Sequence, residues 1–236
     1  MTLTRELITS KQNKLIIQSD NPKIEEFFAD PKNYADSNLN QFNTDRVYDN
    51  ILLGGENLTM LDLGANAGFF SLYAQDRAKI IYAIEPTFSH FHVLTELTKS
   101  YLNIVRCNVA LHNKDEYIPF YSNPENSTMN TTAIKYNNET TPVTGITLKT
   151  LLSSINESHI DFVKCDIEGS EMIALTDETV GEVRDRIKVW FIECHATDHS
   201  NWEASIYTNR SLLATMFVRQ GYQVQLFRRD ILYAYK

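Results

Sequence analysis

The sequence predicts an α/β fold in which a mostly parallel sheet is covered by helices on both faces. Short apolar runs typical of buried strands recur along the chain, and segments with helical spacing lie between most of them. This alternation is typical of parallel strands joined by helices, and 236 residues suffice for one large domain. The runs interpreted as strands are residues 58–64, 79–85, 103–111, 159–167 and 187–195.

The segment before these strands, residues 1–57, is predicted to be helical and to pack on the domain formed by residues 58–236. Pro22 is suited to the first position of a helix that continues through KIEEFFAD. A second helix is expected to begin at Asn43 or Thr44, because short polar side chains favour the cap position. Its expected buried residues, before a stop at Gly54-Gly55, are Val47, Tyr48, Ile51 and Leu52.

Two further helices and a closing hairpin are predicted in the remaining chain. One helix lies between the second and third strands; the other follows the fifth strand and has Gly221 as its C-terminal cap. The tail, residues 222–236, is predicted to form an antiparallel hairpin with its turn at 228–230. The apolar positions of the helices are Phe91, Leu94, Leu97 and Tyr101, then Leu212, Leu213, Met216 and Phe217.

An insertion rich in Ser, Thr and Asn, residues 112–146, separates the third strand from the fourth. One interpretation is a surface hairpin with loops. The other is a lid or substrate-selecting element, since long loops in compact domains often carry function.

Composition and charge restrict the class of partner and the cellular location. The formal net charge of -8 disfavours nucleic acid, whose phosphates are bound by clustered Lys and Arg. We find no apolar run long enough to span a bilayer and no apolar core of a secretion signal, which favours a cytoplasmic protein without a membrane partner. The three cysteines, an odd number, fit reduced thiols.

The stretch MLDLGANAGFF, residues 60–70, predicts a strand, a glycine turn and a helix that approach a ligand closely. Glu85 ends the next strand, where a carboxylate accepts hydrogen bonds from ribose hydroxyls. The turn departs from the dinucleotide motif, because Asn66 stands where a glycine would admit a pyrophosphate. A ligand with ribose and adenine but no pyrophosphate fits better, which favours S-adenosylmethionine over NAD.

Clustered charges in FVKCDIEGSE, residues 162–171, follow the fourth strand. In open parallel sheets ligands bind beyond the carboxyl ends of the strands, near the point where the strand order reverses, and we place that point between the first and fourth strands. Asp166 and Glu168 are therefore expected at the ligand edge. Glu171 is expected mainly to charge the first turn of the next helix.

Taken together, LDLGANAGFFSLYA, YAIEP, ITLKTLL and DFVKCDIEGSE resemble the FkbM family of S-adenosylmethionine-dependent methyltransferases, over roughly residues 58–195. The resemblance implies a seven-stranded Rossmann-like class I methyltransferase fold. It also implies O-methylation of a hydroxyl on a sugar or another small molecule. The positions that would contact the cofactor are Asp62, Gly64, Asn66 and Gly68 at its methionine end, Glu85 at its ribose and Asn108 near its adenine.

For the transfer itself, Asp166 is the first choice to orient or deprotonate the acceptor hydroxyl. Glu168 is the second choice, or it holds the ammonium group of the cofactor. Lys164 shares a strand face with Asp166 and is expected to lower its pKa, and His195 is a candidate general base. A metal is not favoured; the alternative is Mg²⁺ or Mn²⁺ bound by Asp166, Glu193 and His195.

Two other functions compete with methyl transfer. One is NAD-dependent oxidoreduction, which would use the same acid after the second strand. The other is binding of an adenosyl ligand without catalysis on the same fold.

Overall fold

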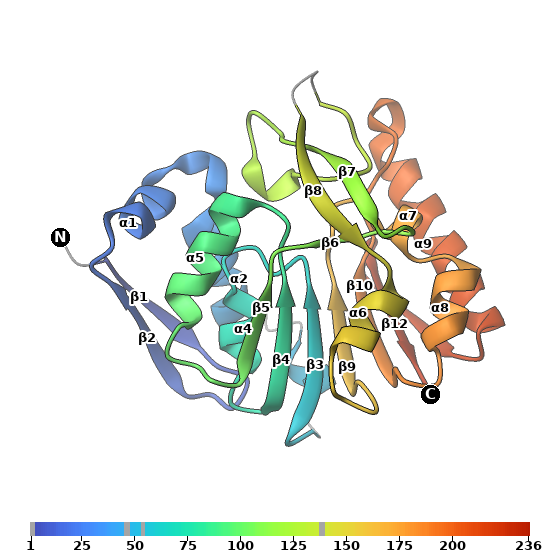
Figure 1. Cartoon of the computed structure of the whole chain (residues 1–236), viewed down its shortest axis with the longest axis horizontal. Coiled ribbons are helices and arrows are strands. Elements are labelled where there is room, and N and C mark those ends of the chain that lie inside the picture. The colour runs from blue at the N-terminus through green and yellow to red at the C-terminus, as the bar shows by residue number, and fades with distance from the viewer. Residues whose placement is uncertain (1–2, 45–47, 53–54, 137–139) are drawn as a thin grey trace.

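A central seven-stranded sheet organises the protein, whose computed structural model describes residues 3–44, 48–52, 55–136 and 140–236 (Figure 1). The strand order is β11-β12-β10-β9-β3-β4-β5. Within this sheet β12 is antiparallel to both of its neighbours, and the other pairings are parallel. The strands are β3 (Leu58–Leu63), β4 (Ala78–Ile84), β5 (Ile104–Cys107), β9 (Phe162–Cys165), β10 (Val189–Glu193), β11 (Gln223–Phe227) and β12 (Ile231–Tyr235).

The strand order reverses beside β3, as predicted. β3 pairs in parallel with β4 on one side and with β9 on the other, so the chain leaves β3 and β9 at the same edge of the sheet. The register aligns Leu63 with Cys165, which places the residues after both strands next to each other. The predicted closing hairpin is also present, as β11 and β12.

Helices cover both faces of the sheet because successive strand residues point to opposite sides. Met60 and Ile81 belong to one apolar cluster, and their neighbours Leu61 and Tyr82 belong to the other. The helices that pack in the first cluster include α4 (Phe69–Ala74) and α5 (Phe88–Thr98). The second cluster contains residues of α6 (Leu148–Ser154), α7 (Glu171–Ala174), α8 (Asp177–Val183) and α9 (Trp202–Arg219).

The predicted apolar stripes of α5 and α9 are largely buried. In α5, Leu94 and Leu97 are buried, whereas Tyr101 lies beyond the end of the helix. In α9, Leu212 is exposed while the other three predicted positions are buried. Gly221 follows the C-terminal cap of α9 with a φ of 85°, the left-handed conformation expected of a terminating glycine.

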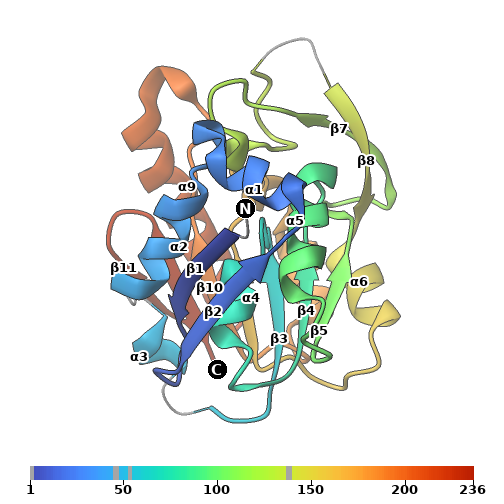
Figure 2. The ribbon, with the colours of Figure 1, turned by 90° about the vertical axis from the view of Figure 1, so that its left-hand side faces the viewer.

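The N-terminal segment differs from the helical prediction, because its first part forms an antiparallel hairpin of β1 and β2. Leu3 and Leu7 of β1 are buried, a spacing that suits either a helix or a strand, and pairing with β2 decides between them. Figure 2 shows the hairpin and α2 in front of α4. The elements are β1 (Leu3–Ile8), β2 (Lys14–Ser19), α1 (Pro22–Ala29), the 3₁₀ helix η1 (Pro31–Asn33), α2 (Ala35–Thr44) and α3 (Asp49–Leu52).

Of the two helix starts predicted in this segment, one is correct and one is wrong. Pro22 is the first residue of α1, and the side chain of Asn21 caps that helix. Asn43 and Thr44 are instead the last residues of α2. The side chain of Asn43 accepts a hydrogen bond from the backbone N–H of Ile8 in β1 and donates one to the backbone carbonyl of Glu6. Tyr48 and Leu52 are buried as predicted, whereas Val47 and Gly54 lie outside the described residues.

The run 103–111 was predicted as one strand and is divided in the structure. It breaks at Asn108, whose side-chain amide donates hydrogen bonds to the backbone carbonyls of Glu85 and Pro86. Beyond the break, β6 (Ala110–Leu111) joins β7 (Glu116–Tyr121) and β8 (Thr140–Ile146) in a second sheet. Most of this sheet belongs to the predicted insertion, and Figure 1 shows β7 and β8 above the carboxyl ends of β3 and β4.

Within the described ranges, none of the helices has both the length and the apolar character needed to cross a membrane.

Candidate active site

The glycine turn after β3 brings the backbone of the first and fourth core strands into contact. Gly64 has a φ of 76°, and a Cβ atom at this position would lie 1.8 Å from the carbonyl oxygen of Asp166. Asn66 also adopts a left-handed conformation, with a φ of 49°, and α4 begins directly after Gly68. The turn is therefore shaped by its packing against the end of β9.

Glu85 directly follows β4, and its side chain reaches the turn after β3. Its side chain is 5% exposed and accepts hydrogen bonds from the backbone N–H groups of Asn66 (2.9 Å) and Thr87 (2.8 Å). Burial raises the pKa of Glu85, although these hydrogen bonds oppose the shift. Asn108 donates to the carbonyl of Glu85 at 2.8 Å, so it supports the loop rather than lining the cavity described below.

Lys164 contacts three polar groups at or near this turn. Its Nζ atom donates to the carbonyl oxygen of Gly64 at 2.8 Å and lies 3.5 Å from Asp62 and 3.2 Å from Asp166. Burial alone would lower the pKa of Lys164, but the charges of Asp166 and Asp62 raise it well above its ordinary value. Asp62 is fully buried, accepts a hydrogen bond from Ser71 and does not line the cavity.

The expected pair is thus present, between Lys164 of β9 and Asp166, the first residue after this strand. Burial tends to raise the pKa of Asp166, but the charges of Lys164 and His195 outweigh it and lower that pKa. Asp166 is therefore ionised at neutral pH. It lines the cavity together with Lys164 and Glu168.

His195 follows β10 and is surrounded by carboxylates. Its Nδ1 atom lies 3.0 Å from Glu171, and its Nε2 atom lies 3.5 Å from Asp166, 3.6 Å from Glu168 and 4.0 Å from Glu193. Burial alone would lower the pKa of His195, but the charges of Glu168 and Glu171 raise it well above its usual value. The surrounding carboxylates therefore favour the protonated form of the ring.

The pKa values of two other acids of this group, Glu168 and Glu193, are shifted in the opposite sense to that of Asp166. Burial, with the charges of Asp166 and Glu193, raises the pKa of Glu168 to about 8. Burial, with the charge of Asp166, raises the pKa of Glu193 to about 7. Both side chains line the cavity, so they are placed to meet a ligand.

Glu171 has a larger role than the charging of a helix end that was expected from the sequence. Its side chain is buried, accepts hydrogen bonds from the N–H groups of Ile167 (2.8 Å) and Gly169 (2.9 Å), and holds His195. A sequence signal existed: Glu171 follows Ile167 by four residues, and a first-turn acid can reach back to preceding backbone N–H groups.

A cavity of about 430 Å³ joins these groups. Gly64, Asn66 and Glu85 line it together with Asp166 and Glu168. Its other walls come from segments outside the central sheet, which the motif analysis did not place at the site. They include Asn38, Gln41, Phe42 and Tyr48 from the N-terminal segment, Phe120, Ser127, Thr128, Asn130 and Thr132 from the insertion, and Arg228 and Asp230 from the terminal hairpin.

The strand order, with the antiparallel β12 inserted beside β10, defines a Rossmann-like class I methyltransferase fold. The sequence profile of the methyltransferase FkbM domain matches residues 62–224. The chain therefore belongs to the FkbM methyltransferase domain family, as the resemblance implied. A comparison with curated proteins finds no match.

Solved structures of low sequence identity share the fold. The FkbM methyltransferase from Methylobacillus flagellatus aligns with a TM-score of 0.52 and 17% identity over 80% of this chain, which spans 46% of that protein. A SAM-dependent methyltransferase from Aquifex aeolicus gives 0.51 and 14% identity over 92% of this chain and 97% of that one. The fibrillarin pre-rRNA processing protein of Methanococcus jannaschii gives 0.50 and 13% identity over 77% and 67% of the two chains.

Proposed function

We propose that the protein is an S-adenosylmethionine-dependent O-methyltransferase that acts on a hydroxyl of a small molecule or sugar. The observation that carries this proposal is the cavity, which connects the Gly64 turn and Glu85 with Asp166 and Glu168. Its volume of about 430 Å³ lies within the range of small-molecule sites. Membership of the FkbM family supports the reaction class.

The residues at one end of the cavity fit an adenosyl ligand. Each carboxylate oxygen of Glu85 accepts one backbone hydrogen bond, and a carboxylate has further acceptor capacity for a ribose hydroxyl. Gly64 and Asn66 line the cavity beside Glu85 and would hold the methionine part. When bound, S-adenosylmethionine supplies an electrophilic methyl group on a positively charged sulfur.

Carboxylates at the other end would act on the acceptor. Asp166, kept ionised by Lys164, would orient the acceptor hydroxyl or accept its proton, and such a base contributes about 10²–10⁴-fold to a rate. Glu168 lies beside it and would serve the acceptor or the ammonium group of the cofactor. Holding the hydroxyl in line with the methyl group accounts for much of the remaining acceleration.

The polar walls of the cavity agree with a hydroxylated acceptor. Side chains such as Asn38, Gln41, Thr128 and Asn130 offer donors and acceptors, and Phe120 and Phe191 offer apolar surface. We further propose that the protein acts in the cytoplasm without a nucleic-acid or membrane partner. The formal net charge of -8 supports the first of these exclusions.

Titration calorimetry with S-adenosylmethionine tests the cofactor assignment. The wild-type protein should bind it with micromolar affinity, and Glu85→Ala should bind at least about tenfold more weakly, because the ribose loses its acceptor. Asp166→Asn should bind it as the wild type does but transfer methyl groups about 10²–10⁴-fold more slowly.

Two results would contradict the proposal. If NAD protects the protein from thermal unfolding and S-adenosylmethionine does not, the oxidoreductase alternative is correct. If S-adenosylmethionine binds but no methyl group reaches any of a broad panel of hydroxylated acceptors, the protein is a binding module.

A further inference from the structure

The group around His195 leaves a space between its polar atoms. The Nε2 atom lies 3.5 Å from Asp166, 3.6 Å from Glu168 and 4.0 Å from Glu193, and none of these contacts is a hydrogen bond. One ligand atom each from Asp166, Glu168 and His195 lies within 4.8 Å of the other two. The three potential ligand atoms therefore face a common space, and Nε2 of His195 makes no hydrogen bond to either carboxylate.

The orientation of the ring is set from outside this group. Glu171 holds Nδ1 at 3.0 Å, and the same carboxylate is anchored by two backbone N–H groups. Nε2 is consequently the ring nitrogen that faces Asp166 and Glu168. A carboxylate that fixes one ring nitrogen while the other faces potential ligands is the usual support of a metal-binding histidine.

Carboxyl groups outnumber the basic side chains around His195. Four carboxylates lie within 4.0 Å of the ring nitrogens of His195. The nearby Lys164 is shared between Asp62 and the Oδ2 atom of Asp166, so the Oδ1 atom of Asp166 faces His195 rather than the lysine. Crowded buried carboxyl groups are either held as neutral acids or coordinate a metal, and a cation bound here would stabilise their ionised forms.

We propose that Asp166, Glu168 and His195 bind one divalent cation, Mg²⁺ or Mn²⁺. Carboxylate oxygens with one imidazole are suitable ligands for these ions, and the ion would displace the proton on Nε2 of His195, so that binding releases a proton to solvent. The sequence alone did not favour a metal, and its alternative set used Glu193, which the structure places farther from His195 than Glu168. Because Asp166 and Glu168 line the cavity, an acceptor hydroxyl could reach the ion and be polarised by it, a role that rests on the proposed function.

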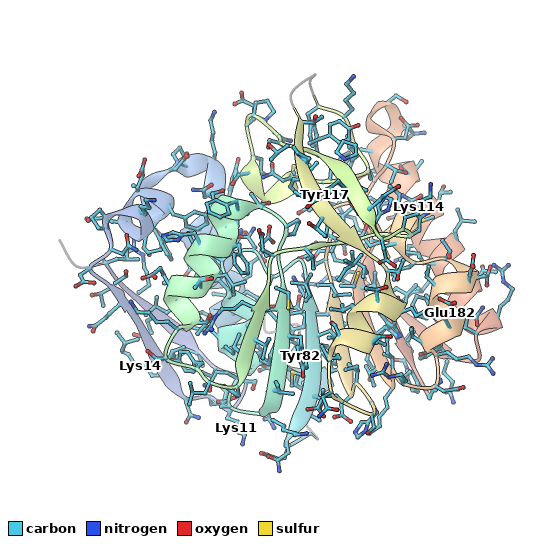
Figure 3. All side chains as sticks on the ribbon, in the orientation of Figure 1. Lys11, Lys14, Tyr82, Lys114, Tyr117 and Glu182 are labelled. Atoms are coloured by element: carbon cyan, nitrogen blue, oxygen red, sulfur yellow. The ribbon has the colours of Figure 1, made fainter. Side chains whose placement is uncertain are left out.

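Mn²⁺ alone, without cofactor or acceptor, tests the site by calorimetry and electron paramagnetic resonance. The wild-type protein should bind one ion per chain, and Glu168→Gln and His195→Gln should each bind at least about tenfold more weakly. Pulsed resonance should show a ¹⁴N coupling in the wild type that is lost in His195→Gln. The control is Glu182→Gln, which changes an exposed acid on α8 (labelled in Figure 3). Glu182 pairs with Lys149, and its substitution should leave binding unchanged.

Absence of Mn²⁺ binding at millimolar concentration would overturn the proposal, as would equal affinity in the wild type and Glu168→Gln. If His195→Gln does not fold, absence of a ¹⁴N coupling in the wild type is the equivalent negative result. Cofactor binding measured separately in EDTA distinguishes the two proposals. Binding of S-adenosylmethionine without Mn²⁺ binding would refute the metal site alone, and the converse would refute only the proposed function.

Discussion

At Gly64 the chain turns with a φ of 76° within contact distance of the backbone of Asp166. Side chains other than glycine rarely adopt this conformation, and here a Cβ atom would also collide with a carbonyl oxygen that belongs to a core strand end. The same residue thus determines both the shape of the turn and the distance between the cofactor side and the acceptor side of the cavity.

We therefore expect Gly64→Ala to reduce the free energy of unfolding by about 3 to 5 kcal/mol, from backbone strain and overpacking together. Gly221→Ala is the matched control, because Gly221 has a φ of 85° but no atom within 4 Å of the added Cβ. It should cost only about 1 to 2 kcal/mol. Urea denaturation of both variants measures the difference, and equal losses would show that contact with Asp166 does not constrain the turn.

At the scale of elements, β3 and β9 are coupled through a buried ion network as well as through their hydrogen bonds. Lys164 of β9 contacts Asp62 of β3, the turn after it and Asp166. The Oδ1 atom of Asp62 has no hydrogen-bond partner among the described residues, so its partner is the ion pair with Lys164 at 3.5 Å. The two strand ends that form the site are held together by this lysine.

Lys164→Met is expected to lower the free energy of unfolding by about 3 to 5 kcal/mol, because it leaves buried carboxylates without their cation. Combining it with Asp62→Asn should cost less than the sum of the two single changes, since the second change removes one of the unpaired charges. Chemical denaturation of the four proteins of this cycle checks the coupling.

Lys149→Met provides the comparison for this cycle. It breaks the exposed pair with Glu182 and should have a much smaller effect. Strict additivity of Lys164→Met and Asp62→Asn would contradict the network.

At the scale of the whole molecule, His90 links three parts that are distant in sequence. It lies on α5, its Nε2 atom is 3.1 Å from Ser127 of the insertion, and its ring packs against Phe27 of α1. Ser127 in turn contacts Asn33 of the N-terminal segment at 2.5 Å. Burial lowers the pKa of His90 to about 4, so the folded protein holds this ring neutral.

This shift predicts a loss of stability in acid. The unfolded chain protonates His90 near its ordinary pKa of about 6.5, whereas the folded protein does so only near 4, so the unfolded state binds more protons between these values. Stability from His90 is present above about pH 6.5 and lost as the pH falls towards 4. Between these limits the wild type should lose about 3 kcal/mol more than His90→Gln, measured by urea denaturation. Identical pH profiles would contradict the assignment.

Local patterns in the sequence were sufficient to predict the parallel core strands of the central sheet and the candidate site residues that follow them. Alternating apolar runs predict β3, β4, β9 and β10, and the glycine turn with Glu85 indicates a ligand site without knowledge of the rest of the chain. These features depend on interactions between residues close in sequence, or on side-chain alternation that every buried strand shares.

Other features depended on the tertiary structure. Leu3 and Leu7 are compatible with a helix or a strand, and only pairing with β2 decides between them. Tyr48 and Ser127 carry no local signal of the cavity that they line, and Glu171 reaches His195 only because β9 and β10 are neighbours. The sequence by itself determined where in the chain the core strands β3, β4, β9 and β10 lie, because their apolar runs are local. Packing between segments far apart in the chain decided which side chains meet around the cavity, because such contacts exist only once the chain has folded.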